Sequence, residues 1–147
     1  MTSILKVSEI QDPTNSNTAL TIDSNGRLGD LTMNGEGGTG NTSVRQGLAK
    51  AWAYINGQAA TAVFFDSFNC SSLTDITTGT YAPQLTNPFS SSSFSQPSCA
   101  HASGVSWCFS VYTGGKTTNQ MYFTTVNTSA SVVDANPVEG AAFGDLA

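Results

Sequence analysis

The chain has 147 residues, with ten acidic against five basic side chains and a formal net charge of -5. This balance argues against nucleic-acid binding, which needs a basic patch, and no apolar run approaches the roughly 18 residues of a membrane span. Only 10% of the residues are charged, against roughly 25% in an average soluble protein. So few charges suit a protein that buries surface against its own copies, and we expect a permanent oligomer.

The first 40 residues predict a small β arm. A short apolar-rich strand is expected at residues 4–10. Two further segments, 19–23 and 27–31, flank Asn25-Gly26, and Asn-Gly is the preferred pair for a tight hairpin turn because both positions need positive φ. The glycine-rich segment 35–41 then predicts a linker or long loop, since it has few side chains to pack.

This arm, residues 1–40, is too small to bury its own apolar side chains. A lone hairpin is marginal in water, so the arm needs a partner surface on the body or on neighbouring chains. The expected attachment and oligomer contacts are Ile4, Val7, Ile10, Leu20 and Ile22.

Residues 41–147 predict an all-β body, an antiparallel β-sandwich. Short strands at a spacing of about 8–12 residues are typical of a sandwich or barrel, and no stretch has a helical period of useful length. Pro83, Pro88, Pro97 and the serines at 90–93 indicate an irregular stretch. The expected strands lie at residues 48–55, 63–68, 73–78, 80–85, 105–112, 121–126 and 138–143.

Aromatic residues in the body have two possible roles. Trp52, Tyr54, Trp107 and Tyr112 could form a platform that stacks on sugar rings, because flat aromatic faces pack well against them. The two tryptophans lie on alternating apolar faces, which favours core packing for them. Tyr54, Tyr81 and Tyr112 are the better candidates for exposed contact.

The cysteines and the histidine predict no metal or catalytic centre. Neither a CxxC pair nor zinc-ligand spacing is present, and buried thiols are favoured over a Cys99–Cys108 bridge. His101 is the only histidine, and no GxSxG elbow accompanies it. A loop position is expected for it, and a metal held by three copies around a threefold axis is the alternative.

Two short motifs and four acidic residues also predict no binding site or catalytic site. The string Gly35–Gly40 matches GxGxxG but lacks the βαβ context, and residues 23–26 lack the closing Glu of a calcium loop. Glycoside cleavage needs two carboxylates at a defined separation, which spacing alone cannot establish. We therefore expect no enzyme activity, cofactor or metal. The four acids are Asp66, Asp75, Asp134 and Glu139.

Several segments resemble a known family. Residues 5–12, followed by 19–23 and Asn25-Gly26, look like the N-terminal part of virion fibre proteins of tailed phages, especially phages of marine bacteria and cyanobacteria. Residues 50–57, 66–75 and 143–147 are similar to the same family. The resemblance implies a trimer whose N-terminal strands attach to the particle and whose β-sandwich is displayed outward. A shaft of repeats is missing, so tail hub, tail nozzle and capsid surface all stay open as attachment points.

The expected function is therefore that of a phage virion structural protein, a short fibre or adaptor. Its partners would be copies of itself, other virion proteins and a host surface glycan, without nucleic acid or membrane insertion. It would assemble in the host cytoplasm and leave by lysis, since residues 1–6 lack a signal-peptide layout. The alternatives are a capsid decoration (cement) protein and a carbohydrate-binding, lectin-like module.

Overall fold

A computed structural model describes residues 9–11, 18–21, 24–25, 32–34, 41–102, 105–107 and 115–147. The chain divides into two compact units, Met1–Leu48 and Ala49–Ala147. In the described part of the chain, no helix is both long enough and apolar enough to span a membrane. The predicted roles of arm and body, attachment and display, concern function and stay predictions.

The described strands of the N-terminal unit begin with an antiparallel pair. β1 (Glu9–Gln11) pairs with β2 (Thr18–Thr21) through a register that contains one irregularity. Asn25 lies in a turn, as its Asn-Gly sequence favours. The second strand of the hairpin that was predicted around this turn, residues 27–31, lies outside the described residues.

A second pair flanks the glycine-rich segment of the same unit. β3 (Thr32–Asn34) pairs antiparallel with β4 (Asn41–Ser43), so the glycine-rich segment connects two hydrogen-bonded strands. The helix α1 (Val44–Gly47) follows β4 directly and is a single turn. Such short pairs bury little surface by themselves, and a two-stranded hairpin is marginal in water.

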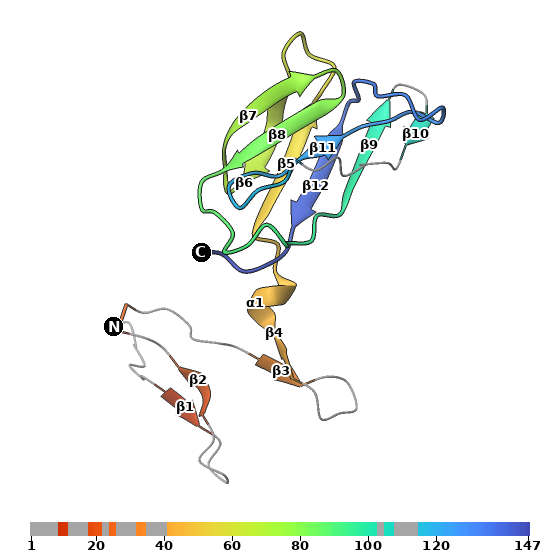
Figure 1. Cartoon of the computed structure of the whole chain (residues 1–147). Helices are drawn as coiled ribbons and strands as arrows, with labels where there is room; N and C mark the ends of the chain where they lie inside the picture. Colours follow the sequence, from red (N-terminus) through yellow and green to blue (C-terminus); the bar gives the residue numbers. More distant parts are fainter. Residues whose placement is uncertain are drawn as a thin grey trace, which may run out of the picture. The chain divides into compact units, whose positions relative to one another are not determined.

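The C-terminal unit is a β-sandwich of two antiparallel sheets, as predicted (Figure 1). One sheet has the strand order β10-β9-β12-β5-β6 and the other the order β11-β8-β7. The predicted bounds at residues 63–68 and 80–85 match two strands fully. The strands are β5 (Ala51–Asn56), β6 (Val63–Phe68), β7 (Cys70–Thr77), β8 (Thr80–Leu85), β9 (Ser98–Ala102), β10 (Val105–Trp107), β11 (Phe123–Thr124) and β12 (Val138–Ala142).

The core lies between the two sheets and follows from the alternation along β5. Its inward side chains are at most 1% exposed: Ala51, Ala53 and Ile55. Alanines are small, so they leave space for the larger Tyr81 and Phe123 of the three-stranded sheet, which are fully buried. The Phe123 ring lies against Gly140 on β12, where a Cβ would come within 2.6 Å of the Cε1 atom. The outward side chains of β5 are thereby left for another role.

A tight corner at Asn69 joins the two sheets. Strand β6 of one sheet passes into β7 of the other through this single residue, whose φ is 58°. Asparagine tolerates this left-handed conformation better than most residues. Its side-chain amide donates to the carbonyl oxygens of Lys50 and Asn87, each at 3.0 Å, and its Oδ1 accepts from the Asn87 amide at 2.8 Å. The corner is thus held by hydrogen bonds on both sides.

Tyr81 is fully buried, so the prediction of an exposed contact there is wrong. It belongs to β8, the central strand of the three-stranded sheet, and its ring points toward the other sheet. Its hydroxyl lies 3.0 Å from Asp134 Oδ1 and 3.2 Å from the carbonyl oxygen of Gly57. The same Oδ1 accepts the amide of Gly79 at 2.6 Å. The polar tip of a buried tyrosine therefore finds its partners inside the body.

This environment predicts an alkaline loss of stability. Burial, together with the hydrogen bond to the Asp134 carboxylate, raises the pKa of Tyr81 well above its ordinary value. Because the fold favours the neutral phenol, its stabilisation is complete below about pH 10 and is lost as the pH rises further. We expect the stability advantage of wild type over Tyr81→Phe, about 1–2 kcal/mol near pH 8, to shrink steadily above pH ~10.

Urea unfolding of both chains between pH 8 and pH ~11.5, followed by circular dichroism, checks this expectation. Burial also raises the pKa of Cys70 to about 11. The stability that the neutral thiol contributes is therefore lost over an overlapping pH range. Its contribution is present in both chains and cancels in their difference. A difference between the two chains that stays constant over this range would contradict the prediction.

Candidate functional site

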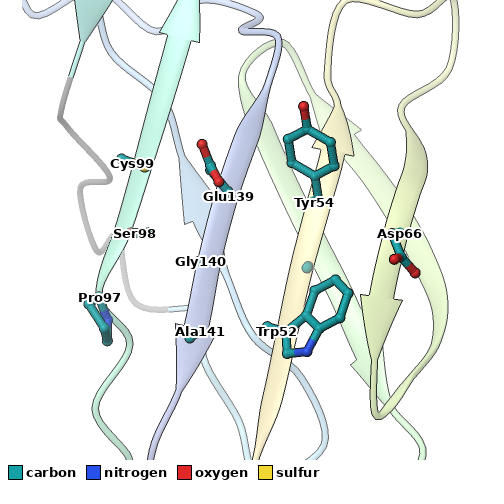
Figure 2. A pocket seen from close by; sticks show the side chains of 10 residues that line it. Trp52, Tyr54, Asp66, Pro97, Ser98, Cys99, Glu139, Gly140 and Ala141 are labelled. Atoms are coloured by element: carbon teal, nitrogen blue, oxygen red, sulfur yellow. The ribbon is translucent and has the colours of Figure 1, made fainter. Parts of the chain in front are cut away.

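A groove lies on the outer face of the five-stranded sheet, the face turned away from the core (Figure 2). It has a volume of about 760 Å³, within the usual range of ligand sites. We call it the aromatic groove. It is lined by Trp52, Ala53 and Tyr54 of β5, Asp66 of β6, Glu139, Gly140 and Ala141 of β12, and Pro97, Ser98 and Cys99 at β9.

Strand register assembles the groove from segments that are far apart in the sequence. Tyr54 lies opposite Glu139 of β12 on one side and Asp66 of β6 on the other. Glu139 in turn lies opposite Cys99 of β9. Since side chains at paired positions project from the same face, these four form one row across the sheet. Trp52 lies in the next row, beside Ala141 of β12.

The aromatic part of the groove comes from one strand, β5. Trp52 is half-buried and Tyr54 is 38% exposed. Being two residues apart on a strand, they project from the same face about 7 Å from each other, and Figure 2 shows both rings standing on that face. Together they offer two neighbouring flat surfaces to a ligand.

A β-bulge on the neighbouring strand supports the Tyr54 ring. The pairing of β5 with β6 shifts between Tyr54 and Ile55, so that Phe65 has no partner in the register. A bulge re-aims side chains locally, and Phe65 lies beside Tyr54 with ring centroids 5.0 Å apart and planes at 37°. Phe65 is 52% exposed, so this pair of rings lies outside the core.

The groove is open because small residues face the aromatic rings. Ala141 lies opposite Trp52 with only a methyl group, and Gly140 beside it has no side chain at all. A larger side chain at Ala141 would occupy the space beside the indole. Asp66 and Glu139, both exposed, are the only charged side chains in the lining. The arrangement can stack a flat ring and accept hydrogen bonds at its two carboxylates.

The four acids that were considered for glycoside cleavage separate into two groups. Asp66 and Glu139 share the groove, two strand spacings apart, or about 10 Å between their Cα atoms. Asp75 accepts the amide of Ala62 at 2.8 Å, and Asp134 holds Tyr81. Those two bonds belong to the architecture of the body. That the protein is no enzyme stays a prediction.

The three tyrosines that were predicted to make exposed contacts differ in where they lie. Tyr54 lies in the groove, Tyr81 lies in the core, and Tyr112 lies outside the described residues. The expected core role of Trp52 is wrong, because it stands on the outer face of the sheet. The burial pattern along β5 places Trp52 and Tyr54 on one face and the two alanines on the other. The alternation in the sequence contains no signal for which of the two faces is covered by a second sheet.

The predicted attachment residues all belong to the N-terminal unit. Ile10 and Leu20 lie opposite each other in the β1–β2 pair, and their side chains are not described. The other three, Ile4, Val7 and Ile22, lie outside the described residues. Their role in attachment stays a prediction.

Cys70 is a half-buried thiol next to the corner between the sheets. Its Sγ donates toward the carbonyl oxygens of Phe68, at 3.5 Å, and Trp52, at 3.6 Å. Burial raises the pKa of this thiol to about 11, so it is a poor nucleophile near neutral pH. Cys99 lines the groove, whereas Cys108 lies outside the described residues, and so does any bridge between the two.

His101 is exposed on β9 and has its backbone engaged in the sheet. Its backbone amide donates to the carbonyl oxygen of Pro137 at 2.8 Å, and its carbonyl oxygen accepts from the backbone amide of Asn136 at 2.6 Å. It therefore lies in a strand, and the predicted loop position is wrong. Within the described ranges, no group of three or more His, Cys, Asp or Glu side chains could hold a metal ion.

Comparisons with known proteins add no relative to this description. No family model matches the chain, and no curated protein or solved structure is significantly similar to it.

Proposed function

We propose that the chain is a structural protein of a tailed-phage virion, a short fibre or adaptor, whose body contacts saccharides on the host surface. Attachment is assigned to the N-terminal unit and host contact to the β-sandwich. The resemblance of the sequence to virion fibre proteins supports the first half of this proposal. The aromatic groove supports the second half and is the observation that carries it.

The groove suits a saccharide for two physical reasons. Sugar rings present patches of C–H groups, which pack on aromatic faces such as those of Trp52 and Tyr54. Sugar hydroxyls are donors, and the carboxylate oxygens of Asp66 and Glu139 can accept their hydrogen bonds. A largely apolar floor with a few convergent polar groups is the usual composition of a specific small-molecule site.

Binding of the full chain to an array of bacterial surface polysaccharides and defined oligosaccharides tests the proposed contact. We expect a subset of glycans to bind, and soluble oligosaccharides of the same structure to compete. Binding to no glycan on the array, by a chain that is folded by circular dichroism, would overturn the host-contact half of the proposal.

Deleting residues 1–40 is expected to leave the body folded but to prevent its incorporation into phage particles. The physical reason is that the core lies within Ala49–Ala147, whereas the deleted segment contains the apolar residues assigned to attachment. Quantitative mass spectrometry of purified particles measures the incorporation. Full-length chain carrying Trp52→Ala is the matched control, and it should be incorporated normally. Particles containing the truncated chain at the full-length level would contradict the assignment.

The capsid decoration protein and the free carbohydrate-binding module are the competing assignments. Chain found on purified capsids without tails would favour decoration, and absence from all particles together with glycan binding would favour the free module. We propose a homotrimer for the fibre or adaptor. Light scattering on the purified chain measures this directly, because a trimer has three times the mass of one chain.

A further inference from the structure

We propose that the aromatic groove selects saccharides that carry free, protonated amino groups and rejects anionic saccharides. This inference rests on the proposed saccharide contact and assigns a chemical class to the ligand.

The charged side chains in the described lining of the groove are both acidic. Asp66 and Glu139 flank Tyr54 in the register, one on each neighbouring strand. No Lys, Arg or His is among the ten residues that line the groove, every one of which is described. Lys50 precedes β5 and His101 follows Cys99 along β9, and both lie outside the lining. Among the described lining residues, a ligand in the groove therefore meets two acidic side chains and no basic one.

The aromatic rings favour the same sign of ligand charge. The faces of tryptophan and tyrosine carry negative electrostatic potential, and an ammonium group within about 6 Å of a ring centroid is attracted to it. An ammonium beside Tyr54 would thus meet a ring face between two strands that each carry a carboxylate. A hydroxyl at the same position gains a hydrogen bond only. The carboxylate of a uronic acid would meet two like charges and is disfavoured.

Four matched trisaccharides separate these possibilities. They are β1,4-linked trimers of glucosamine, N-acetylglucosamine and glucose, and an α1,4-linked trimer of galacturonate. The full chain is titrated with each at pH ~6, where free amino groups are protonated, and binding is followed by calorimetry and by tryptophan fluorescence. We expect the glucosamine trimer to bind about tenfold more tightly than the glucose trimer. The galacturonate trimer should bind most weakly. Raising the salt concentration should shrink the preference for glucosamine.

Neutral variants locate the source of the preference. Glu139→Gln and Asp66→Asn each keep the size of an exposed side chain, and each should reduce the glucosamine-to-glucose affinity ratio about threefold. Asp145→Asn makes the same change of net charge at an exposed residue outside the groove and should leave the ratio unchanged.

Three results would overturn the inference. Equal affinity for the glucosamine and glucose trimers would remove the amino preference and leave the proposed saccharide contact standing. An Asp145→Asn effect as large as that of Glu139→Gln would assign the preference to net charge. If the chain binds neither to the four trimers nor to any glycan on the array, both the preference and the contact are overturned.

Discussion

Replacing Gly57 by alanine is expected to lower the free energy of unfolding by about 3 kcal/mol. An added Cβ would lie 2.2 Å from the hydroxyl oxygen of Tyr81, 2.5 Å from its Cζ and 2.7 Å from the carbonyl oxygen of Ala135. One neighbour is backbone and the other is a buried ring, so neither can move aside cheaply. Moving Tyr81 away from the added Cβ would break the hydrogen bond from its hydroxyl to the Gly57 carbonyl oxygen. Moving the backbone would strain the hydrogen bond from the Gly57 amide to the Ala135 carbonyl oxygen.

Urea unfolding monitored by circular dichroism measures this loss. Gly47→Ala is the matched control, because a Cβ at that exposed helical position meets nothing within 4 Å. It should leave stability unchanged or raise it by up to about 1 kcal/mol. The close approach of Tyr81 to Gly57 is contradicted if Gly57→Ala unfolds within about 0.5 kcal/mol of wild type, the range of a harmless surface change.

Local patterns in the sequence were sufficient for most of the sandwich. β6 is rich in β-forming Val and Phe, and its predicted bounds match. The bounds of β8 match as well, between Gly79 and Asn87-Pro88, although Pro83 lies within the strand. β9, with the sequence Ser-Cys-Ala-His-Ala, was missed because its small polar residues have little intrinsic preference for a strand. It becomes one by pairing with β12 and β10. Its assignment depends on tertiary contacts that no local window contains.

The groove could be predicted only in fragments. Trp52 and Tyr54 were grouped as possible sugar-stacking residues, and Asp66 and Glu139 as possible paired carboxylates. No sequence pattern placed these two pairs together, because their proximity is set by the order of β12, β5 and β6 in the sheet. Tyr81 was predicted to be exposed and is buried, again because of contacts that are distant in the sequence. An amphipathic side chain is suited to surface and core alike, and the partners that bury it, Asp134 and Gly57, are distant in the sequence.

Trp52→Ala is expected to weaken saccharide binding about thirtyfold, or ~2 kcal/mol, the typical loss when a central aromatic contact is truncated. The indole is the largest flat surface in the groove, and its neighbour across the strand pair, Ala141, is too small to replace the contact. Because Trp52 projects away from the core, the variant should fold normally, with a stability loss of about 1 kcal/mol.

Calorimetric titration of the full chain with the best-binding glycan measures the change in affinity. Phe68→Ala is the matched control: Phe68 lies opposite Trp52 on β6, is 52% exposed and is not part of the groove lining. Its removal should change affinity less than about threefold.

A thirtyfold loss in Phe68→Ala with little loss in Trp52→Ala would place the binding surface on the edge strand β6. Similar losses in both would extend the platform across β5 and β6, so that it would hold a longer saccharide than the groove alone. A loss confined to Trp52→Ala makes the indole the central contact, as the position of Trp52 between Ala141 and the edge strand predicts.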